Sequence, residues 1–155
     1  MGQRLTRFPD WQTRLRDAIM ARRTEKFAWG KFDCCLAACD LVEEMTGVDP
    51  AKKLRGYRTA AGAFKKLAQL APEVSEDKRL GVVAAQIAVE LGAPEIPPAY
   101  AQRGDMVLIR AETSVGMTDV LGIVDLTGRY AIVPTTGQGW TLILVDQVRQ
   151  AWKVG

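Results

Sequence analysis

The spacing of hydrophobic positions changes along the chain, from a helical period in the first part to short apolar runs in the last third. Near the start, apolar side chains recur every three to four residues, at Trp11, Leu15, Ala18 and Ile19. This spacing places them on one face of a helix. We therefore predict an amphipathic helix over about residues 9–23.

A second helix is predicted from its end signals. Asp33 stands where an N-cap is wanted, and Gly47 follows Thr46 as a C-terminal stop. Two further periodic segments, at about 57–71 and 80–91, predict two more helices, and Gly92 ends the last one. The first 98 residues thus read as helical.

The pattern then changes to that of a sheet. After the proline-rich stretch "APEIPPAYAQRGD", four short runs rich in β-branched residues follow: "MVLIR", "VLGIV", "RYAIVP" and "WTLILV". Turn residues separate them, and Trp152 is expected in a last edge segment. We predict one α+β domain over residues 1–155, with a basic helix and loop at 1–30, a helical half at 31–98 and an antiparallel sheet at 99–155.

Composition fits a soluble globular protein, with 48% hydrophobic and 25% charged residues. The longest nearly uncharged stretch, residues 80–89, is shorter than the roughly 20 residues that span a bilayer. We therefore expect no stable membrane insertion. The three cysteines include two sequence neighbours, which rarely bridge each other, so reduced thiols in a cytoplasmic setting are expected.

Positive charge concentrates early, although the formal net charge is only +3. The first 31 residues hold eight arginines and lysines against three acids. Such a stripe suits nucleic acid or an acidic protein, and it is also typical of a solvated helix face. No aromatic residues alternate with the charges, so we expect no nucleic-acid partner. Arg14, Arg16 and Arg23 lie away from the apolar face and are candidates for binding another protein.

The cysteines in "FAWGKFDCCLAACD" allow three interpretations. Cys34 follows the predicted cap, where the helix dipole favours a thiolate, so it could be a nucleophile. Metal binding is less suitable, because Cys34 and Cys35 point in different directions and the chain has no histidine, so we expect no metal or other cofactor. All three thiols could instead pack as small hydrophobic groups between helix and sheet.

These motifs carry a resemblance to a known family. A cysteine after Asp33 at the start of a helix, followed by "RGDMVLI" and "VLGIV" as the first two strands, resembles the papain-related NlpC-type cell-wall cysteine peptidases. With "TGVDP", "RGY" and the terminal "AWKV", the chain is also similar to an uncharacterised family encoded in the tail-gene clusters of bacteriophages and prophages. The resemblance implies an NlpC-type papain-like fold, with residues 106–109 and 121–124 as adjacent antiparallel strands facing Cys34.

One position departs from the peptidase pattern. The family's catalytic histidine corresponds to Val120, which cannot take a proton from a thiol. Asp119 is adjacent, but a carboxylate opposes thiolate formation by like charge.

The resemblance therefore implies a virion protein, assembled in the host cytoplasm and placed at the tail tip or baseplate. It would dock on other tail proteins and is compatible with several copies in a symmetric assembly. Two alternatives stay open: an active cell-wall hydrolase or amidase with Cys34 as nucleophile and an unrecognised base, and a module that binds cell-wall fragments or small molecules in the relic cleft.

Overall fold

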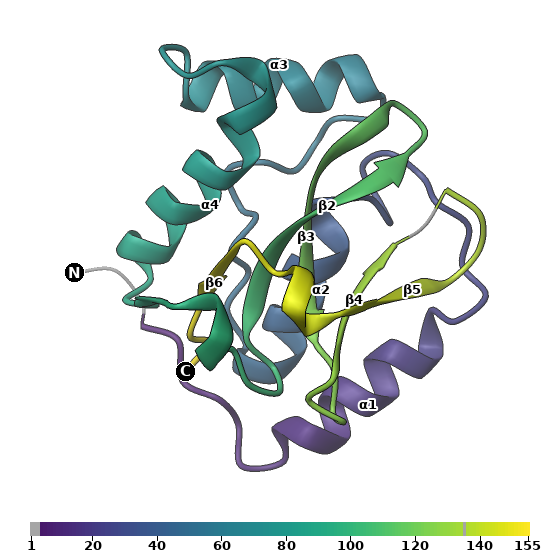
Figure 1. Ribbon diagram of the computed structural model, residues 1–155, viewed down its shortest axis with the longest axis vertical. Coiled ribbons are helices and arrows are strands. Elements are labelled where there is room, and N and C mark those ends of the chain that lie inside the picture. Colours follow the sequence, from purple (N-terminus) through teal and green to yellow (C-terminus); the bar gives the residue numbers. More distant parts are fainter. Residues whose placement is uncertain (1–3, 135) are drawn as a thin grey trace.

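The computed structural model describes residues 4–134 and 136–155 and has an α+β architecture. Four α-helices precede the six strands of one antiparallel sheet (Figure 1). The helices are α1 (Trp11–Ala21), α2 (Leu36–Thr46), α3 (Ala60–Leu70) and α4 (Arg79–Glu90). The strands are β1 (Glu95–Ile96), β2 (Met106–Thr113), β3 (Gly116–Val124), β4 (Tyr130–Pro134), β5 (Trp140–Leu144) and β6 (Gln150–Trp152). Short 3₁₀ turns lie at Glu76–Lys78, Pro98–Tyr100 and Val145–Gln147.

The predicted helices and the four predicted strands are confirmed, with two differences in the sheet. The strand order is β1-β6-β2-β3-β4-β5, so the segment that holds Trp152 lies inside the sheet between β1 and β2, and the prediction of an edge segment was wrong. The sheet also begins at Glu95, before the predicted boundary at residue 99. The strand β1 was missed because it has only two residues, between Pro94 and Pro97.

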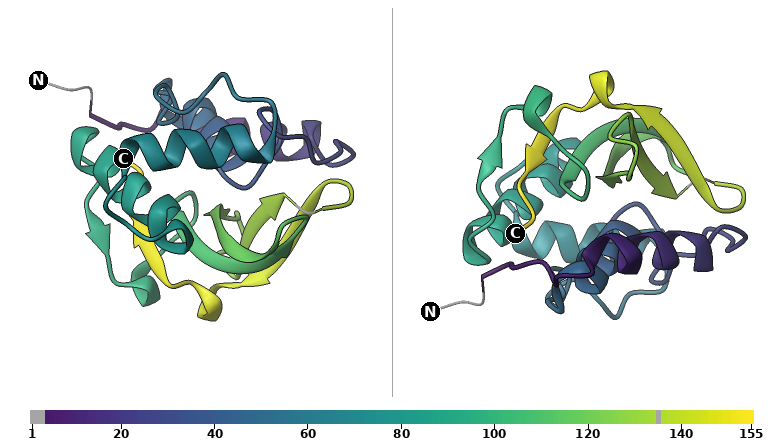
Figure 2. Two further views of the ribbon diagram at one scale, coloured as in Figure 1. Left: turned by 90° about the horizontal axis from the view of Figure 1, so that it is seen from above. Right: turned by 90° about the horizontal axis from the view of Figure 1, so that it is seen from below.

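The two faces of the sheet belong to two apolar clusters. In the β2–β3 hairpin Leu108 pairs with Leu121, and both belong to the larger core that includes α2 and α4. Val107 and Val120 are offset by one residue, point to the other face and belong to a second cluster. Figure 2 shows the resulting arrangement, with α1 and α2 as a layer beside the curved sheet.

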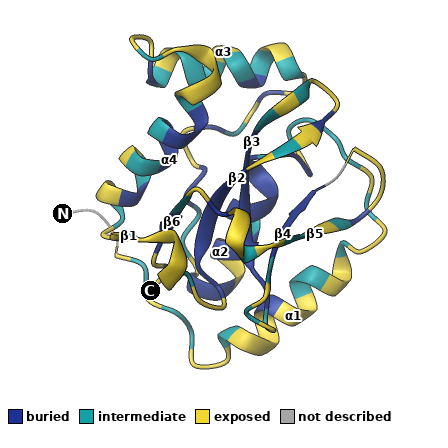
Figure 3. Ribbon diagram, in the orientation of Figure 1, coloured by how far each residue is buried: buried dark blue, intermediate teal, exposed yellow. Residues whose placement is uncertain are grey.

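Helix α2 lies at the centre of the molecule. Eight of its eleven residues are buried, and Figure 3 shows it mostly in the colour for buried residues. It packs against α1 on one side and β3 on the other, so apolar and small side chains are needed around most of its circumference. None of the described helices is long and apolar enough to cross a bilayer.

The two ends of the chain are fastened together by Arg7. Its guanidinium donates to Asp105 Oδ1 at 3.0 Å and to the Val154 carbonyl, and it lies over the Trp11 ring. Asp105 is buried and also accepts from the Val154 N–H. The aspartate of "RGD" therefore has a structural role at the entry to β2.

Candidate functional site

Asp33 organises the turn that leads into α2. Its Oδ1 accepts from the N–H groups of Cys35 (3.0 Å) and Leu36 (2.8 Å). Its Oδ2 accepts from the Gly30 N–H at 2.8 Å and from the Tyr57 hydroxyl at 2.6 Å. The carboxylate is fully buried and has four donors. Asp33 accepts from the N–H groups at the start of α2, as the prediction of a cap requires. The regular helix begins only at Leu36, with Cys35 at its N-cap, so the placement of Cys34 in the first turn of the helix was wrong.

The loop before the cap depends on one glycine. Gly30 has φ +86°, and a Cβ there would lie 2.1 Å from the Tyr57 carbonyl oxygen. Only glycine accommodates both the left-handed backbone and this close approach. Tyr57 is thus held against the loop by its backbone and against Asp33 by its hydroxyl.

Cys34 is joined directly to the sheet. Its carbonyl accepts from the Leu121 N–H at 2.8 Å, so the backbone of this turn binds β3 beside Val120. The Cys34 side chain is partly buried and packs against the apolar cluster that contains Val120 and Ile109. In the same hairpin, Met106 pairs with Ile123 and Ile109 with Val120. The prediction that these two antiparallel strands face Cys34 is confirmed.

The electrostatics of Cys34 differ from the expectation. Burial and the nearby Asp33 carboxylate raise the pKa of the thiol to about 12. The position at the start of a helix favours a thiolate, but removal from water and the neighbouring negative charge act more strongly. The interpretation of Cys34 as an activated nucleophile requires a lowered pKa, so the raised value argues against it.

Val120 lies in β3 next to Leu121, and it is almost completely buried. Its cross-strand partner is Ile109, and it lies among aliphatic side chains of the second cluster. A side chain in this place would be close to the Cys34 turn, because the next residue, Leu121, makes the bond to Cys34. A valine here offers neither a proton acceptor nor a positive charge.

A small pocket opens beside Cys34 and the residues Thr118 and Asp119 of β3. It is bordered by Trp29, Tyr57, Phe64 and Cys34, with Asp119 as its buried carboxyl group. Burial raises the pKa of Asp119, even though Arg149 and Arg110 lie 3.4 and 3.6 Å from Oδ1. Asp119 is paired with two arginines, and a carboxylate near the thiol opposes thiolate formation by like charge, so the two do not form a nucleophile and base couple.

The other two cysteines lie in the core. Cys35 and Cys39 are buried and free, and their side chains hydrogen-bond each other, which together with burial raises the pKa of Cys35. Among the described residues, no cluster of three or more histidine, cysteine, aspartate or glutamate side chains could hold a metal ion. The interpretation of these two thiols as packing groups is supported.

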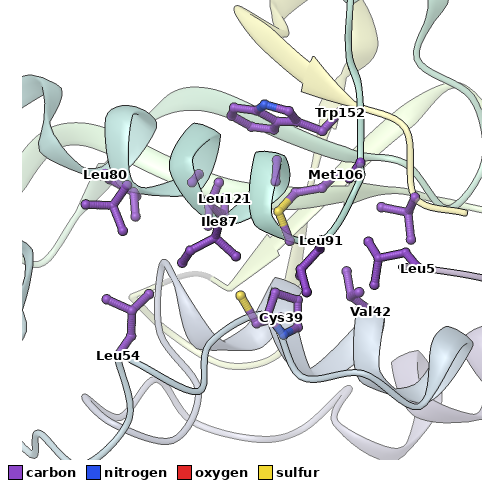
Figure 4. Close-up of a pocket in the computed structure, with 16 residues that line it drawn as sticks. Leu5, Cys39, Val42, Leu54, Leu80, Ile87, Leu91, Met106, Leu121 and Trp152 are labelled. Atoms are coloured by element: carbon purple, nitrogen blue, oxygen red, sulfur yellow. The ribbon is translucent and has the colours of Figure 1, made fainter. Parts of the chain in front are cut away.

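A second pocket is almost wholly apolar. It lies between α2, α4 and the sheet, and Figure 4 shows Cys39, Leu121, Met106 and Trp152 around it, with Leu5 at one side. None of the described residues that border it has a charged side chain. It is a gap in the packing of the main core, without groups that could orient a polar ligand.

The three candidate arginines are exposed, as predicted. Arg14 pairs with Asp10 at 2.8 Å and lies over the Phe8 ring, whereas Arg16 pairs with Asp17 at 3.1 Å. Arg23 donates to the Met20 carbonyl just after α1. The basic stripe is smaller than the sequence indicates, because Arg7 and Arg22 make internal contacts.

Sequence reasoning missed a charged cluster behind α2. Arg55 donates to Asp49 Oδ2 at 2.7 Å and to Asp40 Oδ1 at 2.6 Å. Arg22 also donates to Asp40, and it pairs with Glu25. The signal was present in the motifs "CCLAACD", "TGVDP" and "RGY", whose charged residues contact one another in space.

The fold and this site define an α+β domain in which the turn before the central helix carries a cysteine that contacts the sheet. The chain belongs to the family described as Domain of unknown function (DUF6950), which matches residues 6–154. No curated protein and no solved structure matches the chain significantly.

Proposed function

We propose that this protein is a structural component of a phage tail tip or baseplate, built on a degenerate NlpC-type papain-like fold. In this proposal the domain acts by docking on other tail proteins and resides in the virion after assembly in the host cytoplasm. The observation that carries the proposal is the contact between Cys34 and β3. The Cys34 carbonyl accepts from the N–H of Leu121, and the residue before it, Val120, is the one that the resemblance assigns to the position of the peptidases' histidine.

The chemistry of the pocket supports a role without hydrolysis. The Cys34 pKa is raised, the Asp119 pKa is raised, and the chain contains no histidine. Acyl transfer by a cysteine needs a thiolate and a group that protonates the leaving amine. Loss of such a base costs several orders of magnitude in rate in related triads.

The test compares wild-type protein with Cys34→Ala on purified peptidoglycan and stem peptides. We expect no turnover by either protein, and we expect Cys34→Ala to be incorporated into tail particles as efficiently as wild type. Turnover that disappears in Cys34→Ala would establish the hydrolase instead. Val120→His is a further variant, in which we expect faster thiol alkylation without turnover, because a third polar residue is still absent.

A second candidate function is supported by the aromatic pocket. Trp29, Tyr57 and Phe64 border the space beside Cys34, and rings of this kind stack on sugars or other flat apolar groups. Binding of muropeptides measured by calorimetry, with Phe64→Ala as the variant, tests this role. Heat of binding that is lost in Phe64→Ala would favour a binding module over a purely structural component.

A further inference from the structure

The two edges of the sheet differ in how well they are protected against pairing with a strand of another molecule. At one end β1 has only two residues and is flanked by Pro94 and Pro97, which lack an N–H donor. Beyond Leu108, β2 has no partner in β6, but this part carries the exposed charges of Arg110 and Glu112. Short strands, prolines and charges are the usual means of preventing edge pairing.

The other end of the sheet, β5, has none of these features. Its sequence "WTLIL" has no charge, proline or glycine, and its side away from β4 has no partner strand among the described residues. Leu142 and Leu144 are 57% and 50% exposed. Both side chains lie on one face, because residues two apart in a strand point the same way.

The backbone of β5 also has groups available for pairing. The Val145 N–H donates to the Arg129 carbonyl, so the backbone groups of Val145 point toward β4. The neighbouring residue Leu144 lies opposite Tyr130, whose carbonyl accepts from the Asp125 N–H on the β3 side and therefore does not bind Leu144. Because backbone groups alternate sides along a strand, residues 141 and 143 face β4, and residues 142 and 144 direct their N–H and C=O groups outward.

We infer that β5 pairs with β5 of a second copy of this chain, antiparallel and about a two-fold axis at Ile143. This register places Leu142 opposite Leu144 of the second copy, and the reverse, which joins four leucines on one face. Ile143 lies opposite itself. The outward groups of Leu142 and Leu144 then complete hydrogen-bonded pairs with the second strand.

Two observations favour this occupant and this register. The strand is uncharged, so self-pairing opposes no like charges and buries the exposed leucines of both copies. The residues before β5 are covered by the chain itself, since Lys26 bridges Gln138 and Gly139 donates to Glu25. Pairing must therefore be centred toward the end of β5. The inference is independent of the proposed function.

The first experiment measures the mass of the full chain by sedimentation equilibrium over a range of concentrations. We expect a dimer for wild type and a monomer for the double variant Leu142→Lys/Leu144→Lys. Placing lysines opposite one another should raise the dissociation constant by at least about 100-fold. Val89→Lys is the matched control, because Val89 is 81% exposed on α4, and this variant should remain dimeric.

The second experiment tests the register without adding charge. Directly opposed residues in a non-hydrogen-bonded pair have Cα atoms about 4.5 Å apart, within the range that a disulfide spans. Under mild oxidation Ile143→Cys should form an interchain disulfide. Thr141→Cys, which would face Val145 of the second copy, should not.

The outcomes separate clearly. A monomeric wild type overturns the inference, and so does a dimer that persists in the double lysine variant. Equal cross-linking of Thr141→Cys and Ile143→Cys overturns the register and with it the two-fold strand pair. A monomer that binds an added strand peptide through β5 would show that the edge serves a different protein partner, and would also refute pairing of copies.

Discussion

The turn into α2 and the outer surface of α1 both carry charged side chains, but in opposite settings. At the turn, Asp33 is buried and accepts four hydrogen bonds, three from backbone N–H groups of its own turn and one from the Tyr57 hydroxyl. On α1, Arg14 and Arg16 make exposed ion pairs with neighbours on the same helix. A buried carboxylate ties together parts of the fold, whereas exposed pairs contribute little and remain available to a partner.

Removing the buried carboxylate should have the largest effect. Asp33→Ala leaves the Tyr57 hydroxyl and three backbone N–H groups without their acceptor, and we expect a loss of about 3–5 kcal/mol in the free energy of unfolding. Chemical denaturation measures it. Asp33→Asn keeps the shape and part of the accepting capacity, so it should lie between wild type and Asp33→Ala.

Asp10, an exposed aspartate that pairs with Arg14, provides the control for Asp33. Asp10→Ala removes only the surface pair with Arg14, and we expect a change below about 1 kcal/mol. If Asp10→Ala and Asp33→Ala were equally destabilising, burial would not be what distinguishes the two regions.

Cys34 lies in the same buried turn as Asp33, and its reactivity should also reflect burial. With a pKa raised to about 12 from an ordinary value of 9.0, the thiolate fraction at neutral pH is lower by a factor of about 1,000. Iodoacetamide labelling of native protein, read by mass spectrometry, should therefore be far slower than labelling of unfolded protein. The rate should keep rising with pH above 9, because the folded thiol is still mostly protonated there.

The free energy of unfolding should fall as pH rises above 9, whereas the labelling rate rises. A thiol whose pKa is raised in the folded state stabilises the fold below pH 9, and this contribution is lost as pH rises toward 12. In Cys34→Ala, the free energy of unfolding should therefore decrease less between pH 9 and pH 12 than it does in wild type. Rapid labelling of native Cys34 at neutral pH would contradict the assignment of a protonated thiol and revive the hydrolase.

The sequence predicts the part of this site that follows from local signals. The cap at Asp33, the glycine stop after α2 and the two strands that face Cys34 depend on spacing and turn residues, and the structure confirms them. The Cys34 pKa could not be predicted in this way, because the local dipole favours ionisation and the burial that opposes it arises from tertiary packing.

The partners of charged residues also could not be predicted from local sequence. Arg7 and Arg22 look in sequence like members of a basic stripe, yet their partners Asp105 and Asp40 lie far along the chain. The short strand β1 and the internal place of Trp152 also depend on pairing between distant segments. Sequence spacing cannot show which charges meet across such distances.

Disrupting the charged cluster around Arg55 should have an intermediate effect on the free energy of unfolding. Arg55→Met removes the partner of both Asp40 and Asp49, and we expect a loss of about 1–2 kcal/mol near neutral pH. Lys53→Met is the matched control, since the Lys53–Glu90 pair is exposed, and it should cost less than about 0.5 kcal/mol.

The effect of Arg55→Met should depend on pH. Burial is the largest single influence on the pKa of Asp49 and raises it, but the hydrogen bonds from Arg55 and the Ala51 N–H and the positive charge of Arg55 together outweigh burial, so the pKa is lowered. The stabilisation is therefore complete above the ordinary pKa of 3.8 and is lost as pH falls through the lower, folded value. Denaturation curves of wild type and Arg55→Met should converge in acid, and a constant difference down to the lowest pH would contradict this role of Asp49.

The smallest effect on stability is expected at the candidate docking surface. Reversal of Arg14, Arg16 and Arg23 to glutamate should change the free energy of unfolding by less than about 0.5 kcal/mol at each exposed position. If the surface binds an acidic tail protein, the same variant should enter tail particles less efficiently, most clearly at low salt, because screening weakens the attraction. A control that reverses Arg58, Lys65 and Lys78, which are exposed elsewhere, changes the net charge equally and should be incorporated normally. Equal incorporation of both triple variants across salt concentrations would mean that the exposed pairs of α1 are only solvated, and that docking uses another surface.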